Sequence, residues 1–207
     1  MLRRIIHRLH TIIEKFDQPA AVPQAAELQM IWPKARLSSP PSLSVPEDYV
    51  MRLYKQGDET DFFSLMERAG YPNWSRVEFE PYLQKLLPDG FFFLFHRQTG
   101  DMTATAMALH NPSPLHPFGG TLSCVAVDPQ HQGKGLGAVV SSLVLCRLIA
   151  AGYQNIYLCT DDWRLPAIKT YLKMGWEPLL FQDDMYERWQ RVCAQLNWHF
   201  TPEAWSR

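Results

Sequence analysis

The sequence is poor in cysteine, and its four cysteines are not spaced as a metal site or a disulfide framework requires. They are Cys124, Cys146, Cys159 and Cys193, which lie far apart with no Cys-x-x-Cys pair among them. Three of them fall inside apolar strand or helix patterns, which predicts buried, reduced thiols. None of the seven histidines lies four residues from a cysteine, and no metal is predicted.

Long apolar runs and an excess of charge of either sign are also absent. No stretch approaches the ~18 consecutive apolar residues of a membrane span, and the first residues lack the uninterrupted apolar core of a secretory signal. The formal net charge is −1, which gives no global electrostatic case for binding nucleic acid. These absences predict a cytoplasmic protein with no membrane span and no nucleic-acid partner.

Residues 1–45 are predicted to form an extension in front of the catalytic domain. Near its start, apolar residues recur at helical spacing, with arginines and a lysine at other positions, which predicts a basic amphipathic helix. The apolar positions are Leu2, Ile5, Ile6, Leu9, Ile12, Ile13 and Phe16. Docking on its own domain or pairing in a homodimer is favoured for this helix, while lipid contact and targeting stay open. Proline-rich linkers at 19–26 and 38–46 flank a short strand expected at 28–32.

Residues 46–207 alternate between strand and helix patterns, which predicts one folded domain. Period-two alternation and apolar runs predict strands at 49–54, 91–95, 103–110, 120–127 and 156–160. Helical spacing and end signals predict helices at 58–69, 79–87, 137–151, 166–174 and 185–196. The fold class is therefore α/β, an α+β mixed sheet covered by helices, in a single domain behind the N-terminal helical extension.

A glycine-rich turn lies between the strand at 120–127 and the helix at 137–151. Glycines at such a turn let the backbone pass close to a ligand, and N–H groups at a helix start favour anionic oxygens. A Walker A loop is excluded because Lys134 is followed by Gly135 rather than by Ser or Thr. A dinucleotide fingerprint is matched formally by Gly133, Gly135 and Ala138, but too few residues follow for its repeated βαβ units. The turn is thus expected to bind phosphate in another setting.

A third pattern, Gln/Arg-x-x-Gly-x-Gly/Ala, is met by Gln132, Gly135 and Gly137, with Val-Ala-Val-Asp-Pro in front of it. Downstream, residues 156–178 read as a strand, a helix and a Gly-Trp turn. In this order and at this separation, the two segments resemble the acyl-CoA-binding motif of the GNAT superfamily of N-acyltransferases. The resemblance covers residues 46–182 in pattern and is sharp from 125 to 178. It implies the mixed sheet of the GNAT fold and an acyl-CoA substrate.

The resemblance also implies which residues contact the coenzyme. Backbone amides of the turn would hold the pyrophosphate, and the Lys134 ammonium would add a point charge. The turn residues are Gln132, Gly133, Lys134, Gly135, Leu136 and Gly137. The strand residues Val125, Ala126 and Val127 would lie beside the pantetheine arm and the thioester carbonyl, where their amides could support the oxyanion. The family often has Asn where this chain has Arg164, and an Arg there could pair with a phosphate of the coenzyme.

By the same resemblance, Tyr171 is the expected general acid. It lies four residues after Ala167 and four before Gly175, which is the frame of the family's acid. A phenol with a pKa near ~10 is protonated at neutral pH, so it can release a proton to the departing thiolate.

The general base and the acceptor pocket are not fixed by the sequence. Four residues are candidates for the base beside a water relay, and none is preferred: Asp161, Asp162, His110 and Ser123. Four others could line an acceptor pocket, with their roles open: Trp74, Arg76, Tyr82 and Trp163.

The expected function is that of an acetyl-CoA-dependent N-acetyltransferase. It would transfer an acetyl group directly to a primary amine of a small molecule or a protein, without a metal. The alternative is a non-catalytic acyl-CoA-binding or assembly module, in which the N-terminal helix makes the important contact. The two differ in turnover: a binding module would show affinity for acetyl-CoA and release no thiol.

Overall fold

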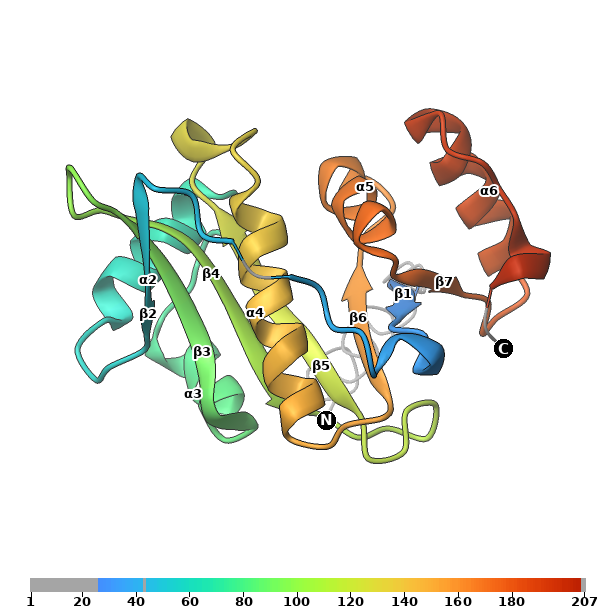
Figure 1. Ribbon diagram of the computed structural model, residues 1–207, viewed down its shortest axis with the longest axis horizontal. Coiled ribbons are helices and arrows are strands. Elements are labelled where there is room, and N and C mark those ends of the chain that lie inside the picture. The colour runs from blue at the N-terminus through green and yellow to red at the C-terminus, as the bar shows by residue number, and fades with distance from the viewer. Residues whose placement is uncertain (1–25, 43, 206–207) are drawn as a thin grey trace, which may run out of the picture.

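The computed structural model describes residues 26–42 and 44–205 (Figure 1). The amphipathic helix expected near the N-terminus lies outside the described residues. Within them, seven strands form one mixed sheet in the order β2-β3-β4-β5-β6-β1-β7. The strands are β1 Leu28–Ile31, β2 Tyr49–Leu53, β3 Leu86–His96, β4 Met102–His110, β5 Gly120–Val127, β6 Ile156–Thr160 and β7 Glu177–Leu179. Neighbouring strands are antiparallel except β5 and β6, which run parallel.

Helices cover both faces of this sheet, so the expected α/β fold class is confirmed. On one face lie α2 Glu59–Arg68 and α3 Arg76–Leu83, and the other core is built with α4 Leu136–Ala150, α5 Leu165–Met174 and α6 Met185–Leu196. Short 3-10 turns occur at η1 Lys34–Arg36, η2 Pro129–His131 and η3 Pro202–Ala204. In Figure 1, α4 crosses the central strands and α5 lies beside it.

The apolar run in β3 shows why the sheet has two cores. Alternate side chains of a strand point to opposite faces, so Phe91 and Phe93 pack with α2 and α3, while Phe92 and Leu94 pack with α4. Each such side chain, when fully buried, stabilises the fold by roughly 1.5–3 kcal/mol. The part of β3 from Phe91 to Phe95, which is apolar at every position, is therefore covered by helices on both faces of the sheet.

Strand β1, expected at 28–32, is part of this sheet. It pairs antiparallel with both β6 and β7, and the side chains of Leu28 and Met30 are fully buried. The division of the chain after residue 45 stays a prediction, but β1 shows that residues before it contribute to the central sheet.

Two local expectations differ from the structure. The helix expected at 79–87 is wrong in its bounds, because Ser75 starts α3 early: its hydroxyl accepts from the Val77 N–H and also hydrogen-bonds Glu78, as in a capping box. Residues 86–90 begin β3 instead, where Leu86 pairs with Leu109 of β4. Strand β7 was not expected, because three residues that include a proline carry no readable alternation.

Candidate active site

The two parallel strands in the middle of the sheet separate from each other after a short pairing. Strands β5 and β6 pair only from Gly120 to Leu122, against Ile156 to Leu158. Farther along, β6 pairs with β1 and β5 stays with β4, so the sheet opens into a V between them. Figure 1 shows β5 and β6 close at one end and apart at the other. An opening at this point gives ligands access to the edges of both strands.

A β-bulge lies on β5 at the start of this opening. Thr105 of β4 is opposite Ala126 and Met107 is opposite Ser123, so β5 has one residue more than β4 between these pairs. Cys124, inside the bulge, has φ +51°, in the left-handed region. A bulge removes a residue from the regular ladder and turns the following side chains. It thereby directs the end of β5 toward the opening.

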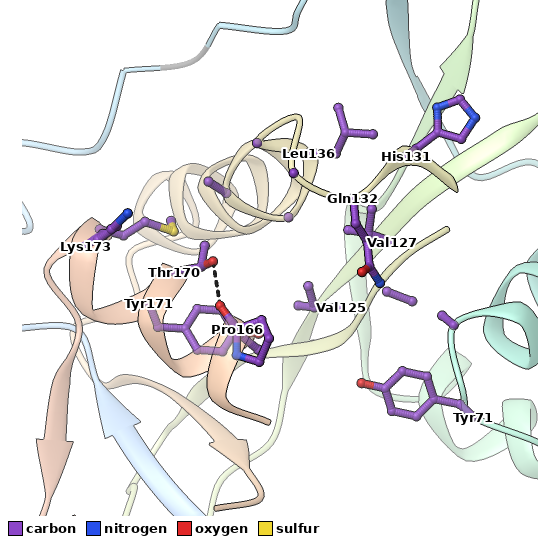
Figure 2. Close-up of a pocket in the computed structure, with 18 residues that line it drawn as sticks. Tyr71, Val125, Val127, His131, Gln132, Leu136, Pro166, Thr170, Tyr171 and Lys173 are labelled. Carbon is purple, nitrogen blue, oxygen red and sulfur yellow. Dashed lines mark hydrogen bonds between the residues drawn. The ribbon is translucent and has the colours of Figure 1, made fainter. Parts of the chain in front are cut away.

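A first cavity of about 660 Å³ lies along the end of β5, the glycine turn and α5. Figure 2 shows Tyr171 of α5 on one side, Tyr71 on the other, and Val125 between them. Leu136, Gly137 and Ala138, in the first turn of α4, also line it. The first hydrogen bond within α4 runs from the Val139 N–H to the Gly135 carbonyl at 3.1 Å. The amides before Val139 have no partner within the helix, so this end of the cavity suits an anion.

The backbone of the glycine turn explains its sequence. Gly133 and Gly135 have φ of +75° and +79°, and Gly135 is the N-cap of α4. The turn is held at its start by Asp128, whose carboxylate accepts from the Gln130 N–H at 2.9 Å and from Arg68 Nε at 2.6 Å. The first turn of α4 has no acidic side chain. The turn is thus shaped to bring backbone donors, free of nearby carboxylates, to the cavity.

Most of the site residues expected from the sequence lie on this cavity. Those that line it are Val125, Ala126, Val127, Gln132, Gly133, Gly135, Leu136, Gly137 and Tyr171. Lys134 is not among them, and its ammonium lies 5.9 Å from the centre of the Tyr49 ring. Arg164 lines a different cavity, where it pairs with Asp161 at 2.8 Å and donates to the Tyr71 hydroxyl at 2.6 Å.

Tyr171 is almost fully buried on α5. Burial raises the pKa of its phenol, the nearby Tyr71 raises it further, and the positive charge of Arg164 opposes the shift. The phenol therefore keeps its proton throughout the physiological pH range.

A second cavity of about 600 Å³ lies on the other side of Tyr171. Trp74 and Tyr82, expected as acceptor residues, line it with ring centres 5.2 Å apart. Arg76 and Trp163 do not line it, and Trp163 is 71% exposed. Residues that the sequence analysis did not single out also lie on its wall: Glu27, Tyr71, Lys85 and Asn111.

The four candidate bases are not brought together. Ser123 lines the second cavity. Asp161 forms an ion pair with Arg164, and Asp162 pairs with Arg188 of α6. His110 Nδ1 lies 2.8 Å from the Tyr153 hydroxyl, outside both cavities.

The two cavities share part of their walls. Tyr71, Val125, Ala167 and Tyr171 line both. One side offers backbone donors for an anionic ligand and the other offers charged and aromatic side chains, with a protonated phenol between them. This arrangement can bring two substrates together for transfer of a group past Tyr171.

Comparison with known families agrees with this geometry. The model of the acetyltransferase (GNAT) family matches residues 59–176, more than half of the chain. The chain belongs to the GNAT acetyltransferase family. The match includes α2, the bulged strand, the glycine turn and α5. The expected resemblance to this family is thereby confirmed.

Relatives and solved structures support this GNAT assignment. The chain is 28% identical over 167 residues to a mycothiol acetyltransferase from Saccharomonospora viridis, covering 75% of this chain and 52% of that protein. It thus spans about half the length of the curated relatives it matches. The ribosomal-protein-S18-alanine N-acetyltransferase of Escherichia coli is similar in structure, with TM-score 0.50, 25% identity and coverage of 61% of this chain and 76% of that one. A GCN5-related N-acetyltransferase from Sphaerobacter thermophilus shares the fold at TM-score 0.56 and 16% identity, over 83% of this chain and 53% of that one.

The cysteines of this GNAT protein are less buried than the sequence predicts. All four are free, but only Cys193 is buried, and Cys159 is exposed. Cys124 and Cys159 line the second cavity because the opening between β5 and β6 uncovers both strands. Across residues 26–42 and 44–205, no cluster of three or more His, Cys, Asp or Glu is placed to hold a metal. No helix in the described part of the chain is long and apolar enough to cross a membrane.

Proposed function

We propose that this GNAT acetyltransferase takes the acetyl group of acetyl-CoA and transfers it directly to a primary amine of a small molecule. The observation that carries the proposal is the meeting of the two cavities at Tyr171 and Val125. A thioester in one cavity and an amine in the other would meet at these shared walls. Holding two reactants in line makes the transfer effectively unimolecular.

The first cavity suits the donor. The amides of Leu136, Gly137 and Ala138 and the positive end of the α4 dipole favour pyrophosphate oxygens. Gly137 has room for such an approach, because an added Cβ would meet only a methyl of Val127, at 3.6 Å. The end of β5 would lie along the pantetheine arm, and amides released from the ladder by the bulge would support the oxyanion.

Tyr171 would supply the proton that the departing thiolate needs. Its phenol is protonated at working pH and lies where the two cavities join. A thiolate is a poor leaving group in an apolar site unless its developing charge is neutralised, so a fixed proton donor there lowers the barrier.

Transfer without an acyl-enzyme is supported by the two thiols in the second cavity. Desolvation by the cavity wall raises the pKa of both Cys124 and Cys159 to about 12, even though part of Cys159 is exposed, and the charge of Glu27 adds to the shift at Cys159. Only the thiolate is an effective nucleophile, and at neutral pH both groups are thiols. The amine is therefore the expected attacking group.

A small-molecule acceptor is supported by the size of the second cavity and by the relatives. Cavities of about 300–1,000 Å³ hold ligands of small-molecule size, and this one measures about 600 Å³. Two relatives that are 28% and 29% identical to this chain over the aligned residues are named mycothiol acetyltransferases, after a small molecule.

The experiment is an assay of acetyl-CoA with a broad panel of amines, in which free thiol and acetylated amine are both measured. We expect thiol release that depends on the amine and matches product by mass. Tyr171→Phe should lower kcat by about 10²- to 10⁴-fold while the Kd for acetyl-CoA is unchanged, because only the proton donor is removed. Tyr186→Phe is the matched control, since Tyr186 is exposed on α6 and away from both cavities.

Two outcomes would contradict the proposal. Tight binding of acetyl-CoA with no turnover on any amine would favour the non-catalytic binding module instead. Absence of acetyl-CoA binding to the full chain would remove the donor assignment altogether.

A further inference from the structure

Glu27, the residue before β1, lies at the second cavity. The register of β1 against β6 pairs Leu28 with Thr160, which brings Glu27 beside Asp161 at the end of β6. Its side chain lines the cavity together with Ser123, Cys159 and Tyr171. Glu27 is also exposed, so it lies where the cavity opens to solvent.

The segment that carries Glu27 is held from two sides. On one side are the ladder hydrogen bonds of β1 with β6 and β7. On the other, Arg188 of α6 donates from Nη1 to the Ala26 carbonyl at 2.8 Å, and its Nε donates to Asp162 at 3.1 Å. The Arg188 side chain is buried, 7% exposed, so its geometry is fixed by packing. The position of Glu27 is thus set by the fold.

The other acids near the opening are paired with arginines. Asp161 is held by Arg164, and Asp162 by Arg188. Among the described residues that line the second cavity, Glu27 is the one carboxylate. Lys85 and Arg164 are the cations on the same wall, and neither can accept a proton in its charged form.

The surroundings of Glu27 raise the pKa of its carboxyl above the ordinary value. Partial desolvation against the cavity wall raises this pKa although the residue is exposed at the opening, the negative charge of Asp161 raises it further, and Arg164 lowers it in part. Tyr82 and Cys159 line the same cavity, and the negative charge of Glu27 raises the pKa of both. A raised pKa makes the Glu27 carboxylate a stronger base than an ordinary glutamate.

We infer that Glu27 is the catalytic base of the proposed transfer and takes the proton that the acceptor ammonium must lose before it attacks. This role rests on the proposed function. Glu27 directly precedes β1, which pairs with β6. It is not one of the four candidate bases that the sequence suggested.

The proton balance of the step is complete with residues of this chain. Glu27 removes one proton from the ammonium, directly or through one water, and the nitrogen forms a bond to the thioester carbon. The carbon–sulfur bond breaks, its electron pair stays on sulfur, and Tyr171 protonates that sulfur. The second nitrogen proton then returns to the Tyr171 oxygen, and Glu27 releases its proton to the solvent at the cavity opening. The products are the amide, free coenzyme A and one proton.

The test is the pH dependence of kcat for Glu27→Gln in the full chain, with two acceptors whose amine pKa values differ. On the acidic side of the profile, kcat falls as a group becomes protonated. If the pH of this fall changes with the acceptor, the group is the amine; if it is the same for both acceptors, the group belongs to the enzyme. We expect Glu27→Gln to lower kcat by about 100-fold or more and to remove the fall of kcat in acid that is the same for both acceptors. Glu27→Asp should restore part of the rate, and Glu80→Gln, at an exposed position on α3 off the cavity wall, should match wild type.

Asp161→Asn tests the direction in which the pKa of Glu27 changes. Removing the negative charge beside Glu27 lowers the pKa of its carboxyl, so the fall of kcat that belongs to the enzyme should move to lower pH. A Glu27→Gln protein that is folded and keeps wild-type kcat and the same fall of kcat in acid overturns the inference, as does a change confined to the acceptor KM. If wild type itself transfers no acetyl group to any amine, the proposed function fails, which is a different result from a wild type that turns over without help from Glu27.

Discussion

The two cavities that meet at Tyr171 are built in different ways. The first is lined largely by backbone and apolar side chains from the end of β5, the glycine turn and α5. The second is lined by side chains from the segment before β1, from α2 and α3, and from β4, β5, β6 and α5, and its charged and aromatic members come from outside the β-strands. A wall made of backbone presents the same donors whatever the neighbouring side chains are. A wall made of side chains changes with each substitution, so we expect selectivity for the acceptor to reside there.

Among the substitutions that distinguish the two cavities, the largest effect is expected at Gly135, on the affinity of the first cavity for acetyl-CoA. Gly135→Glu places a carboxylate at the N-terminus of α4, where it would repel the pyrophosphate and compete for its amide donors. Loss of these charged hydrogen bonds costs about 2–3 kcal/mol, which corresponds to a Kd for acetyl-CoA raised roughly 30- to 150-fold. Calorimetric titration of acetyl-CoA into wild type and Gly135→Glu measures this change in Kd.

Gly152→Glu is the matched control for this substitution. Gly152 follows the other end of α4 with φ +85°, close to the +79° of Gly135, and an added Cβ meets nothing within 4 Å at either position. Both variants carry the same backbone strain of about 1–2 kcal/mol. Equal weakening of acetyl-CoA binding in the two would mean that strain, and not the phosphate site, causes the loss.

A smaller effect, confined to the acceptor, is expected at Trp74. Trp74→Phe keeps an aromatic ring against Phe62 and Tyr82 but shortens the wall of the second cavity. A lost aromatic contact of about 1 kcal/mol raises the acceptor KM roughly fivefold and leaves the Kd for acetyl-CoA unchanged. Steady-state kinetics with the amine varied would show it.

The control for Trp74 is Trp163→Phe. Trp163 is largely exposed and does not line the second cavity, so its substitution should leave both constants as in wild type. A raised acceptor KM in Trp163→Phe alone would place the acceptor outside this cavity.

The difference in construction also explains how far the sequence could be interpreted. The glycine turn and the frame around Tyr171 are continuous stretches, so their motifs and the resemblance that they carry predicted nine of the eighteen residues that line the first cavity. Glu27 and Asn111 reach the second cavity only through strand pairing, which no local pattern encodes. The sequence pattern predicted β1, but its position between β6 and β7 depends on pairing with strands that are distant in the sequence. The signal that could have found Glu27 is its position directly before that strand.

The smallest effect is expected on stability, at the support of the first cavity. Burial alone would raise the pKa of Asp128, but hydrogen bonds from Arg68 and from the Gln130 N–H lower it below its usual value. Asp128→Asn keeps an acceptor for Gln130 and loses the ion pair with Arg68 of α2, which should cost about 1 kcal/mol, or roughly 2–4 °C in Tm at pH 7. Thermal unfolding of both proteins at several pH values measures the difference.

The pH dependence of that difference follows from the direction of the shift. A carboxyl whose pKa is lowered by folding stabilises the protein at pH above its unfolded value, near ~3.9, and the contribution is lost as the pH falls through the folded pKa. The Tm of wild type should therefore exceed that of Asp128→Asn at pH 7 and approach it in acid. Asp183→Asn, at an exposed position between β7 and α6, controls for the loss of one negative charge. A gap in Tm that stays constant into acid would mean that Asp128 acts through packing rather than through its charge.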